Sequence, residues 1–317
     1  MSAVPVYADI EAAARRIAPH VRVTPVLSAA SLDELAGCRL HFKCENFQRA
    51  GAFKFRGACN AVWSLPDAIA ARGVVTHSSG NHGAALALAA KTRGIPAHVV
   101  VPAGAVATKL AAIARAGAAV HECAPTLAAR DAMAAELERT TGATLVHPFT
   151  DPRVIAGQGT AARELLEQAG PLDALIAPIG GGGLIGGSAI AARALAPAIR
   201  LFAAEPEGAA DAHASLAAGR RVADLVPETI CVGLRATLGE INFALLRAHG
   251  VEVLLASDVE TVAAMRLVFE RLKIVVEPSS AIALAAILRH RARFAGLRVG
   301  VILTGGNVDP DRLPWQS

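Results

Sequence analysis

The chain has 317 residues, a hydrophobic share of 53%, a net charge of +4 and a pI near 9.0. A chain of this length buries about three quarters of the surface that it exposes when unfolded, so a disordered protein is excluded and one or two stable domains are expected. The arginines are scattered along expected helices, without a basic cluster that alternates with aromatic residues, so nucleic-acid binding is not predicted.

Targeting and cysteine patterns favour a cytoplasmic protein. Asp9 and Glu11 stand near the start, where a signal peptide would be basic and then apolar. The uncharged run at residues 174–192 contains Pro178 and six glycines, so we do not expect it to span a membrane. Five cysteines without a C-x-x-C pair predict reduced thiols, mostly in the core, rather than a disulfide framework or a zinc site.

A lysine follows the first expected strand, LHFKCE at residues 40–45. The stretch GAFKFRG at residues 51–57 places Lys54 between Phe53 and Phe55. An ammonium held in an apolar loop either reaches water or has its pKa lowered toward that of a nucleophilic amine. A surface lysine and a reactive amine both remain open at this point.

From residue 73 onward, short β-rich runs alternate with alanine-rich helical stretches. Strands are expected at residues 73–79, 96–102, 118–123, 143–149, 174–180, 199–205 and 296–303, with a helix beginning near Asn81. This rhythm predicts an α/β fold with two parallel-sheet lobes. We expect a large domain at residues 1–70 and 150–317 and a small domain inserted at 71–149, with crossings near Pro66 and residues 148–152.

The loop HSSGNHG at residues 77–83 joins a strand to a helix. The side chains of Ser78, Ser79 and Asn81, together with backbone amides at the positive end of the helix, can hold a carboxylate. The alternative is that Asn81 only caps the helix and His82 is a buried polar residue with satisfied hydrogen bonds.

A second polar loop, IGGGGLIGGS, also lies between a strand and a helix. Amides without Cβ hindrance can wrap a phosphate at Gly180, Gly181, Gly182 and Gly183. The stretch also satisfies the dinucleotide pattern G-x-G-x-x-G, and Glu205 lies about 20 residues beyond, as that pattern requires. A phosphate loop, a nicotinamide dehydrogenase and a plain tight turn therefore remain open. A third loop, VILTGGN, presents Thr304 after the last strand.

Six segments together resemble the serine/threonine dehydratase and serine racemase family, in order and over nearly the whole chain. They are KCENFQRAGAFKFRGACNAV, VVTHSSGNHGAALALAA, VIAGQGT, GGGGL, AAEP and LTGGNVD. The resemblance implies a pyridoxal-phosphate enzyme of fold type II, with the cofactor in the large domain. It also implies a homodimer or larger homo-oligomer that acts on a small amino acid.

The resemblance implies roles for individual residues. Lys54 would form the Schiff base with the cofactor and then take the substrate α-proton, and Ser79 would act on the opposite face. Phe53 would lie against the pyridine ring, Asn81 would reach its 3-hydroxyl group, and the four glycines would hold the phosphate. The substrate carboxylate would be surrounded by Ser78, Ser79, Asn81 and His82.

Thr304 matches the residue that bonds the pyridine nitrogen, and a neutral partner there weakens the ring as an electron sink. This favours β-elimination, so we expect L-threonine or L-serine to be converted to a 2-oxo acid and ammonia.

The alternative is a serine racemase or a 3-hydroxyaspartate dehydratase, since Arg130 matches an arginine that can approach a second carboxylate. Val232 and Ala236 replace the aspartate and serine usual in serine racemases, and a surface role for Arg130 stays open. A dehydrogenase is the remote alternative.

The resemblance also implies a divalent-cation site formed by Glu205, the Ala209 carbonyl and Asp211. Such oxygen ligands suit Mg²⁺, Ca²⁺ or Mn²⁺. The alternative is a pair of exposed acids after a strand.

Overall fold

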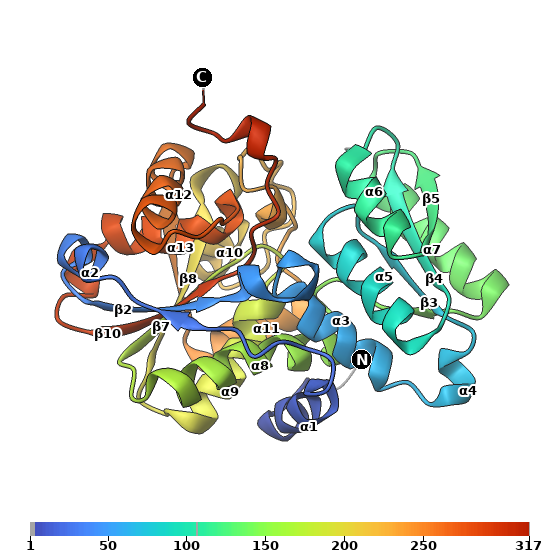
Figure 1. Cartoon of the computed structure of the whole chain (residues 1–317), viewed down its shortest axis with the longest axis horizontal. Coiled ribbons are helices and arrows are strands. Elements are labelled where there is room, and N and C mark those ends of the chain that lie inside the picture. The colour runs from blue at the N-terminus through green and yellow to red at the C-terminus, as the bar shows by residue number, and fades with distance from the viewer. Residues whose placement is uncertain (1–3, 106, 317) are drawn as a thin grey trace. The chain divides into compact units, whose positions relative to one another are not determined.

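The computed structural model describes residues 4–105 and 107–316, which form two compact units. Unit 1 comprises the described residues through Val21 together with Lys54–Gly157. Unit 2 comprises Arg22–Phe53 together with the described residues from Gln158 onward. Each unit has its own sheet with helices on both faces (Figure 1).

Unit 2 contains a six-stranded sheet in the order β1-β2-β10-β7-β8-β9. All neighbouring pairs are parallel except β1 with β2. The inner strands are apolar and buried along nearly their whole length, as strands covered on both faces must be. The strands are β1 (Val26–Leu27), β2 (Arg39–Cys44), β7 (Ala174–Pro178), β8 (Arg200–Pro206), β9 (Glu252–Ala256) and β10 (Arg298–Leu303).

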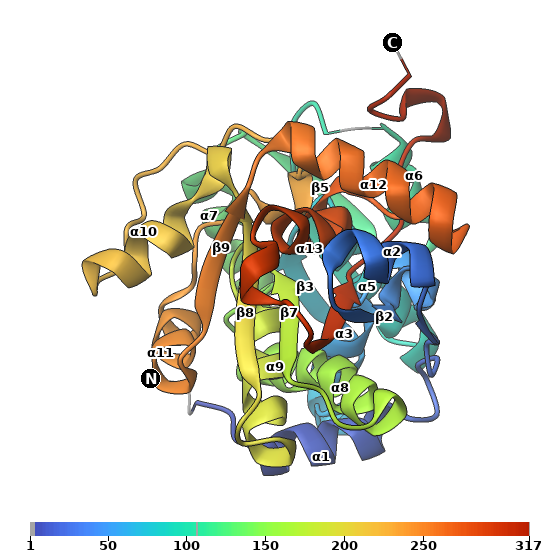
Figure 2. The same cartoon turned by 90° about the vertical axis from the view of Figure 1, so that its left-hand side faces the viewer.

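Two helical layers cover this sheet (Figures 1 and 2). On one face α13 (Pro278–Arg289) packs along the strands, with α12 (Asp258–Leu272) and α2 (Ala30–Ala36) over the same apolar cluster. On the other face lie α8 (Pro152–Ala169), which begins in unit 1, and α9 (Gly183–Leu195), with α11 (Glu240–His249) against α9. The short α10 (Asp211–Ala218) contacts β9 and α11.

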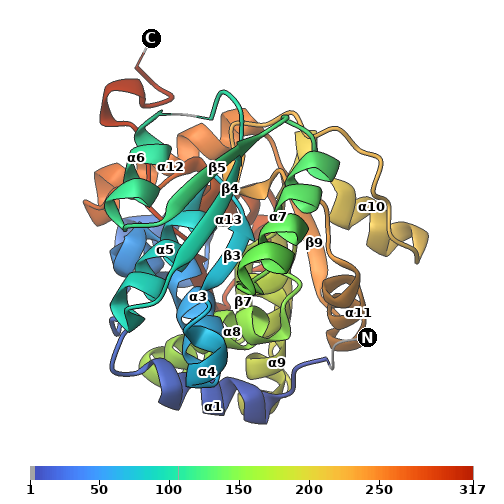
Figure 3. The same ribbon diagram turned by 90° about the vertical axis from the view of Figure 1, so that its right-hand side faces the viewer.

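Unit 1 contains a four-stranded parallel sheet in the order β5-β4-β3-β6. Figure 3 shows α5 (Asn81–Arg93) and α6 (Ala107–Arg115) on one face and α7 (Leu127–Thr141) on the other. In the same unit, α3 (Lys54–Trp63) packs on α5, and α1 (Tyr7–Ile17) packs on α3. The short α4 (Asp67–Ala70) follows α3 in the sequence. The strands are β3 (Val74–His77), β4 (Ala97–Pro102), β5 (Ala119–Cys123) and β6 (Thr144–Leu145).

The predicted α/β class with two parallel-sheet lobes is confirmed. All four strands of the smaller sheet lie within residues 71–149, whereas α1 and α3 group with this sheet because α3 packs on α5. The domain limits at residues 70 and 150 stay a prediction. The five cysteines are free, and all but Cys123 are buried. Among the described residues, no helix is long and apolar enough to cross a membrane.

A fully buried lysine ties β2 to α8 within unit 2. Lys43 Nζ donates to the Thr24 carbonyl at 2.8 Å, to Glu164 Oε2 at 2.7 Å and to Gln168 Oε1 at 2.7 Å. The Lys43 side chain has no exposed surface, and that of Glu164 is 17% exposed. An ammonium this deeply buried is tolerated because three acceptors satisfy its three N–H groups.

We expect Lys43→Met to lower the free energy of unfolding by about 3 kcal/mol, because it removes a fully buried ammonium that pairs with the largely buried Glu164 carboxylate. Denaturant unfolding followed by circular dichroism measures the loss. Arg266→Ala is the control, since it breaks the exposed Arg266–Glu270 pair and should cost less than about 1 kcal/mol. Equal losses in the two variants would contradict the assignment of this network to the core.

Candidate active site

The predicted site residues divide between the two units, and each unit holds a self-contained part. In unit 1, Lys54 is the first residue of α3 and not, as expected, part of a loop. Its Nζ donates to the Pro148 carbonyl at 3.2 Å, and Phe55 beside it is fully buried. Because helical side chains lean toward the N-terminus, the start of α3 projects this amine beyond the helix.

The serine loop lies between β3 and α5. Gly80 is the N-cap of α5 and Asn81 is already helical, so the alternative in which Asn81 serves only as the cap is wrong. A Cβ at Gly83 would lie 2.0 Å from the Ser78 carbonyl oxygen, which explains why this turn requires glycine. The Ser79 hydroxyl has no hydrogen-bond partner among the described residues. Together with the amides of the first helical turn, which have no intrahelical acceptor, it offers donors to an anion.

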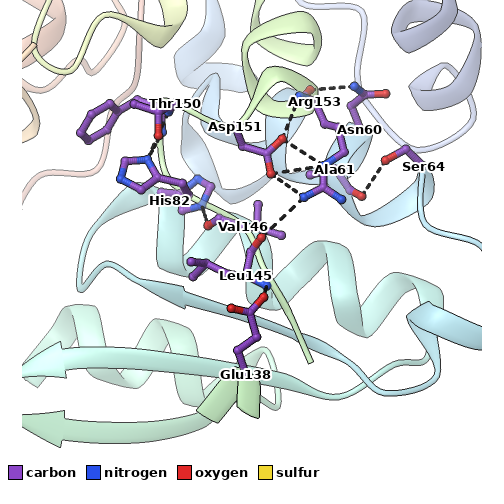
Figure 4. Close-up of polar contacts among 12 residues, drawn as sticks. Asn60, Ala61, Ser64, His82, Glu138, Leu145, Val146, Thr150, Asp151 and Arg153 are labelled. Carbon is purple, nitrogen blue, oxygen red and sulfur yellow. Dashed lines mark hydrogen bonds and ion pairs between the residues drawn. The ribbon is translucent and has the colours of Figure 1, made fainter. Parts of the chain in front are cut away.

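Three histidines, two of which sequence reasoning missed, surround this part of unit 1. His82 is buried, its Nε2 lies 3.4 Å from the Val146 carbonyl, and its Nδ1 has no partner (Figure 4). Burial, with a smaller contribution from the charge of Lys54, holds the His82 pKa well below its usual value. His77 makes an edge-to-face contact with His147, and burial lowers its pKa too. The surroundings of the amine are therefore uncharged imidazoles.

The proton of His147 can be assigned to one nitrogen. His147 Nδ1 accepts from the Thr150 amide at 3.1 Å and from the Phe149 amide at 3.4 Å, so the ring carries its proton on Nε2. Burial first, and then the charges of His77 and Lys54, lower the His147 pKa to about 4. His147 is thus a neutral donor through Nε2. Its position at the end of the last strand of this sheet was the only sequence signal for it.

The segment after His147 is fixed by an ion pair. Arg153 Nη2 donates to Asp151 Oδ2 at 2.6 Å, and the Arg153 carbonyl accepts from Asn60 Nδ2 at 2.7 Å (Figure 4). Because Asn60 belongs to α3, these contacts join the chain carrying Pro148 to the helix that begins with Lys54.

In unit 2, the glycine loop between β7 and α9 forms a cradle for an anion. Gly182 has φ +89°, and a Cβ there would lie 2.8 Å from Asn242 Cβ. Asn242 Nδ2 donates to the Gly181 carbonyl at 2.6 Å and fixes the loop. The first intrahelical bond joins the Gly186 amide to the Gly182 carbonyl, so the amides of Gly183, Leu184 and Ile185 lack an intrahelical acceptor. These buried amides, without a side-chain cap, fit a phosphate group.

Thr304 lies buried at the end of β10 in unit 2. Its hydroxyl lies 3.5 Å from the Ser279 carbonyl, and its own carbonyl accepts from the Phe53 amide at 2.9 Å. Ser279 Oγ in turn accepts from the Gly233 amide at 3.0 Å. Sequence reasoning missed Ser279 and Asn242, because neither stands in a motif of its own.

The alternative in which Glu205 and Asp211 are exposed acids is wrong, since both are buried. Glu205 accepts from the Ala212 amide at 2.7 Å and the His213 amide at 2.8 Å, and Asp211 accepts from the Leu238 amide at 2.7 Å. Burial, with a contribution from the Asp211 charge, raises the Glu205 pKa to about 8. Glu205 is therefore not placed to bind a dinucleotide ribose. In the sequence, Ala209 lies between the two acids, at the end of the 3₁₀ turn Glu207–Ala209.

Comparisons with known proteins identify the family of the chain. Residues 17–305 match the family described as "Pyridoxal-phosphate dependent enzyme". A β-hydroxyaspartate dehydratase from Paracoccus denitrificans is 52% identical over 98% of this chain and 99% of its own length. A serine racemase from Arabidopsis thaliana is 48% identical over 98% of this chain and 95% of its own. The solved structure of maize serine racemase has a TM-score of 0.95 at 45% identity, covering 98% of this chain and 95% of that one.

The protein is thus a pyridoxal-phosphate-dependent enzyme of fold type II. Within that class it belongs to the family of serine racemases and hydroxy-amino-acid dehydratases, as the sequence motifs predicted.

We expect Gly182→Ala to lower the pyridoxal phosphate content of the purified protein several-fold, because the new methyl group would meet Asn242 and Leu238 at 2.8 Å. The cofactor released by alkali is measured by absorbance. Gly219→Ala is the matched control: Gly219 has φ +68°, but nothing lies within 4 Å of the added methyl group. It should cost about 1 kcal/mol of stability without loss of cofactor. Equal cofactor loss in both variants would contradict the cradle.

The raised pKa of Glu205 predicts how stability depends on pH. A carboxyl group with a folded-state pKa of about 8 and an ordinary value of 4.5 favours the folded state at low pH, and this contribution is lost as pH rises through 8. In the presence of a chelator, the Tm should therefore fall between pH 6 and pH 9. Glu205→Gln should have a lower Tm and a flatter pH profile, because its amide cannot ionise and loses one backbone bond. Parallel profiles would refute this role for Glu205.

Proposed function

We propose that the protein is a dehydratase of 3-hydroxyaspartate, releasing the corresponding 2-oxo diacid and ammonia. The observation that carries this proposal is the 52% identity to a β-hydroxyaspartate dehydratase over nearly the whole of both chains. This similarity supports the alternative considered from the sequence better than the preference for L-threonine or L-serine. Val232 and Ala236, which replace residues usual in serine racemases, point the same way.

Arg130 supplies the cation that a substrate with two carboxylates requires. It lies on α7, partly exposed, and its Nε donates to the Thr126 carbonyl at 3.4 Å. α7 packs against β3, and the Arg130 charge lowers the pKa of His77 at the end of that strand. Asp131, the next residue, lies 3.6 Å from His77 Nε2, so this part of α7 faces the same strand end. We therefore assign Arg130 to the second carboxylate of the substrate.

The remaining roles are those that the family resemblance implies, and the chemistry of each side chain suits them. When bound, pyridoxal phosphate delocalises the electrons left by removal of the α-proton. We assign cofactor attachment and proton removal to Lys54 Nζ, and the α-carboxylate to the serine loop with Asn81 and His82. The glycine cradle is assigned to the phosphate, Phe53 to the ring face and Thr304 to a neutral hydrogen bond. Uncharged histidines near Lys54 do not compete with it as acids.

Serine racemisation is the second candidate function. The observation that favours it is the Ser79 hydroxyl, which has no partner among the described residues and can return a proton to the substrate. The 48% identity to a serine racemase supports the same possibility.

We also propose that Glu205, Asp211 and the Ala209 carbonyl bind a hard divalent cation such as Mg²⁺, Ca²⁺ or Mn²⁺. Burial raises the pKa of both carboxyl groups, and the Asp211 charge raises that of Glu205 further, so a bound cation would favour their ionised forms. No cluster of three or more His, Cys, Asp or Glu side chains within the described ranges could hold a metal, so carbonyl groups and water must complete the shell. Mg²⁺ should raise the Tm at pH 8.5 in the wild type and not in Asp211→Asn; the same rise in both would refute the site.

Arg130→Met should raise the KM for 3-hydroxyaspartate about 10- to 100-fold, because it removes a charge-assisted hydrogen bond of about 1.5–3 kcal/mol. Turnover of L-serine, which has no second carboxylate, should change little. Release of 2-oxo acid and of the opposite enantiomer is measured for both substrates. Arg139→Met is the control, since Arg139 lies on the same helix in an exposed pair with Glu136. Faster release of 2-oxo acid from L-serine than from every hydroxyaspartate isomer would overturn the proposal.

A further inference from the structure

We propose that His98 and His121 form a binding site for a transition-metal ion such as Cu²⁺, Ni²⁺ or Zn²⁺ on the sheet of unit 1. His98 Nδ1 and His121 Nε2 lie 3.1 Å apart, with ring centroids 5.3 Å apart and ring planes inclined by 40°. Neither residue belongs to the site described above, and neither was singled out by a sequence motif.

The register of β4 and β5 places the two rings on one face. Val100 pairs with His121, so His98, two residues earlier on β4, is the diagonal neighbour of His121 on the same side. This is the face covered by α7, because Val100 and Cys123 pack with Ala134 of that helix. β5 is an edge strand, and both histidines are partly exposed. Solvent and small ions can therefore reach the pair.

The separation of the two nitrogens fits one metal ion. With metal–nitrogen bonds of about 2.0–2.1 Å, two imidazoles in cis positions of a square-planar centre are about 2.9 Å apart, and at a tetrahedral centre about 3.4 Å. The observed 3.1 Å lies between these values.

A direct N–H···N hydrogen bond between the rings is the competing explanation. It needs a proton on one of the two facing nitrogens, whereas metal binding needs that proton on the far nitrogen of each ring. Neutral imidazole exchanges between these tautomers readily. Burial and the neighbouring His121 lower the His98 pKa, so the neutral form that binds metals is favoured in either case.

The ligand set determines which ions are taken. Imidazole nitrogens prefer Cu²⁺, Ni²⁺ and Zn²⁺ to Mg²⁺ or Ca²⁺. Within the described ranges, no third His, Cys, Asp or Glu completes a metal cluster, so water occupies the remaining positions and the ion exchanges. The ion would join β4 to the edge strand β5. This site therefore differs in ion class from the carboxylate pair in unit 2.

The test uses the untagged holoenzyme titrated with Cu²⁺ alone, followed by electron paramagnetic resonance and equilibrium dialysis. The wild type should bind one Cu²⁺ with a signal showing two nitrogen ligands. His98→Gln and His121→Gln should each weaken that binding about tenfold or more, as loss of a ligand must cost at least what loss of a supporting contact costs. His41→Gln is the matched control, because His41 is also a partly exposed strand histidine.

Retention of the same Cu²⁺ affinity and two-nitrogen signal by both variants would overturn the proposal. So would a wild-type signal with one nitrogen ligand. Circular dichroism establishes that each variant is folded. Should one fail to fold, a wild-type crystal soaked with Zn²⁺ decides by anomalous density: density between the two rings supports the site, and none there refutes it.

Discussion

Parallel strand pairing is the constraint on which both sheets and most of the candidate site residues depend. A parallel strand cannot turn back directly, so each one is followed by a crossover that begins at its carboxyl end. The serine loop follows β3, His147 follows β6, the glycine cradle follows β7 and Thr304 follows β10. Glu205 lies in the last part of β8. In each unit, the chemistry therefore lies where parallel topology leaves backbone amides without partners.

Helix starts and buried side chains then set the charge of each part. The cradle at α9 and the serine loop at α5 both present amides of a first helical turn, which favours anions without any lysine or arginine. Around Lys54, burial, with a smaller contribution from the charge of the lysine itself, keeps His82 and His147 neutral. In unit 2, burial has the opposite effect on Glu205, which gains a proton unless a cation is present. One physical cause, desolvation on burial, thus sets the protonation state of the histidines in unit 1 and of Glu205 in unit 2.

Periodicity predicted most of the fold, because the buried strands β3, β4, β7, β8 and β10 are continuous apolar runs that a parallel sheet requires. It missed the helical start at Lys54, since the glycine at position 57 reads as a loop signal. The glycine and serine loops could be predicted because glycine frees backbone amides, and serine and asparagine add donors, where a strand gives way to a helix. The sequence did not predict the histidine cluster, the contact of Asn242 with the glycine loop or the burial of Glu205. Each depends on which segments distant in sequence pack together.

Substrate choice in this family must come from side chains outside the shared lysine and cradle. A dicarboxylic substrate adds one negative charge, which we propose that Arg130 binds, since His77 is held neutral by burial. Serine offers a small hydroxyl group instead and gains nothing from a guanidinium. Asp131 limits the effect, because its carboxylate next to Arg130 repels the same substrate. Arg130 would attract the second carboxylate, and Asp131, which lies near His77, would repel it. The balance between these two charges is what would separate a hydroxyaspartate dehydratase from a serine racemase on the same fold.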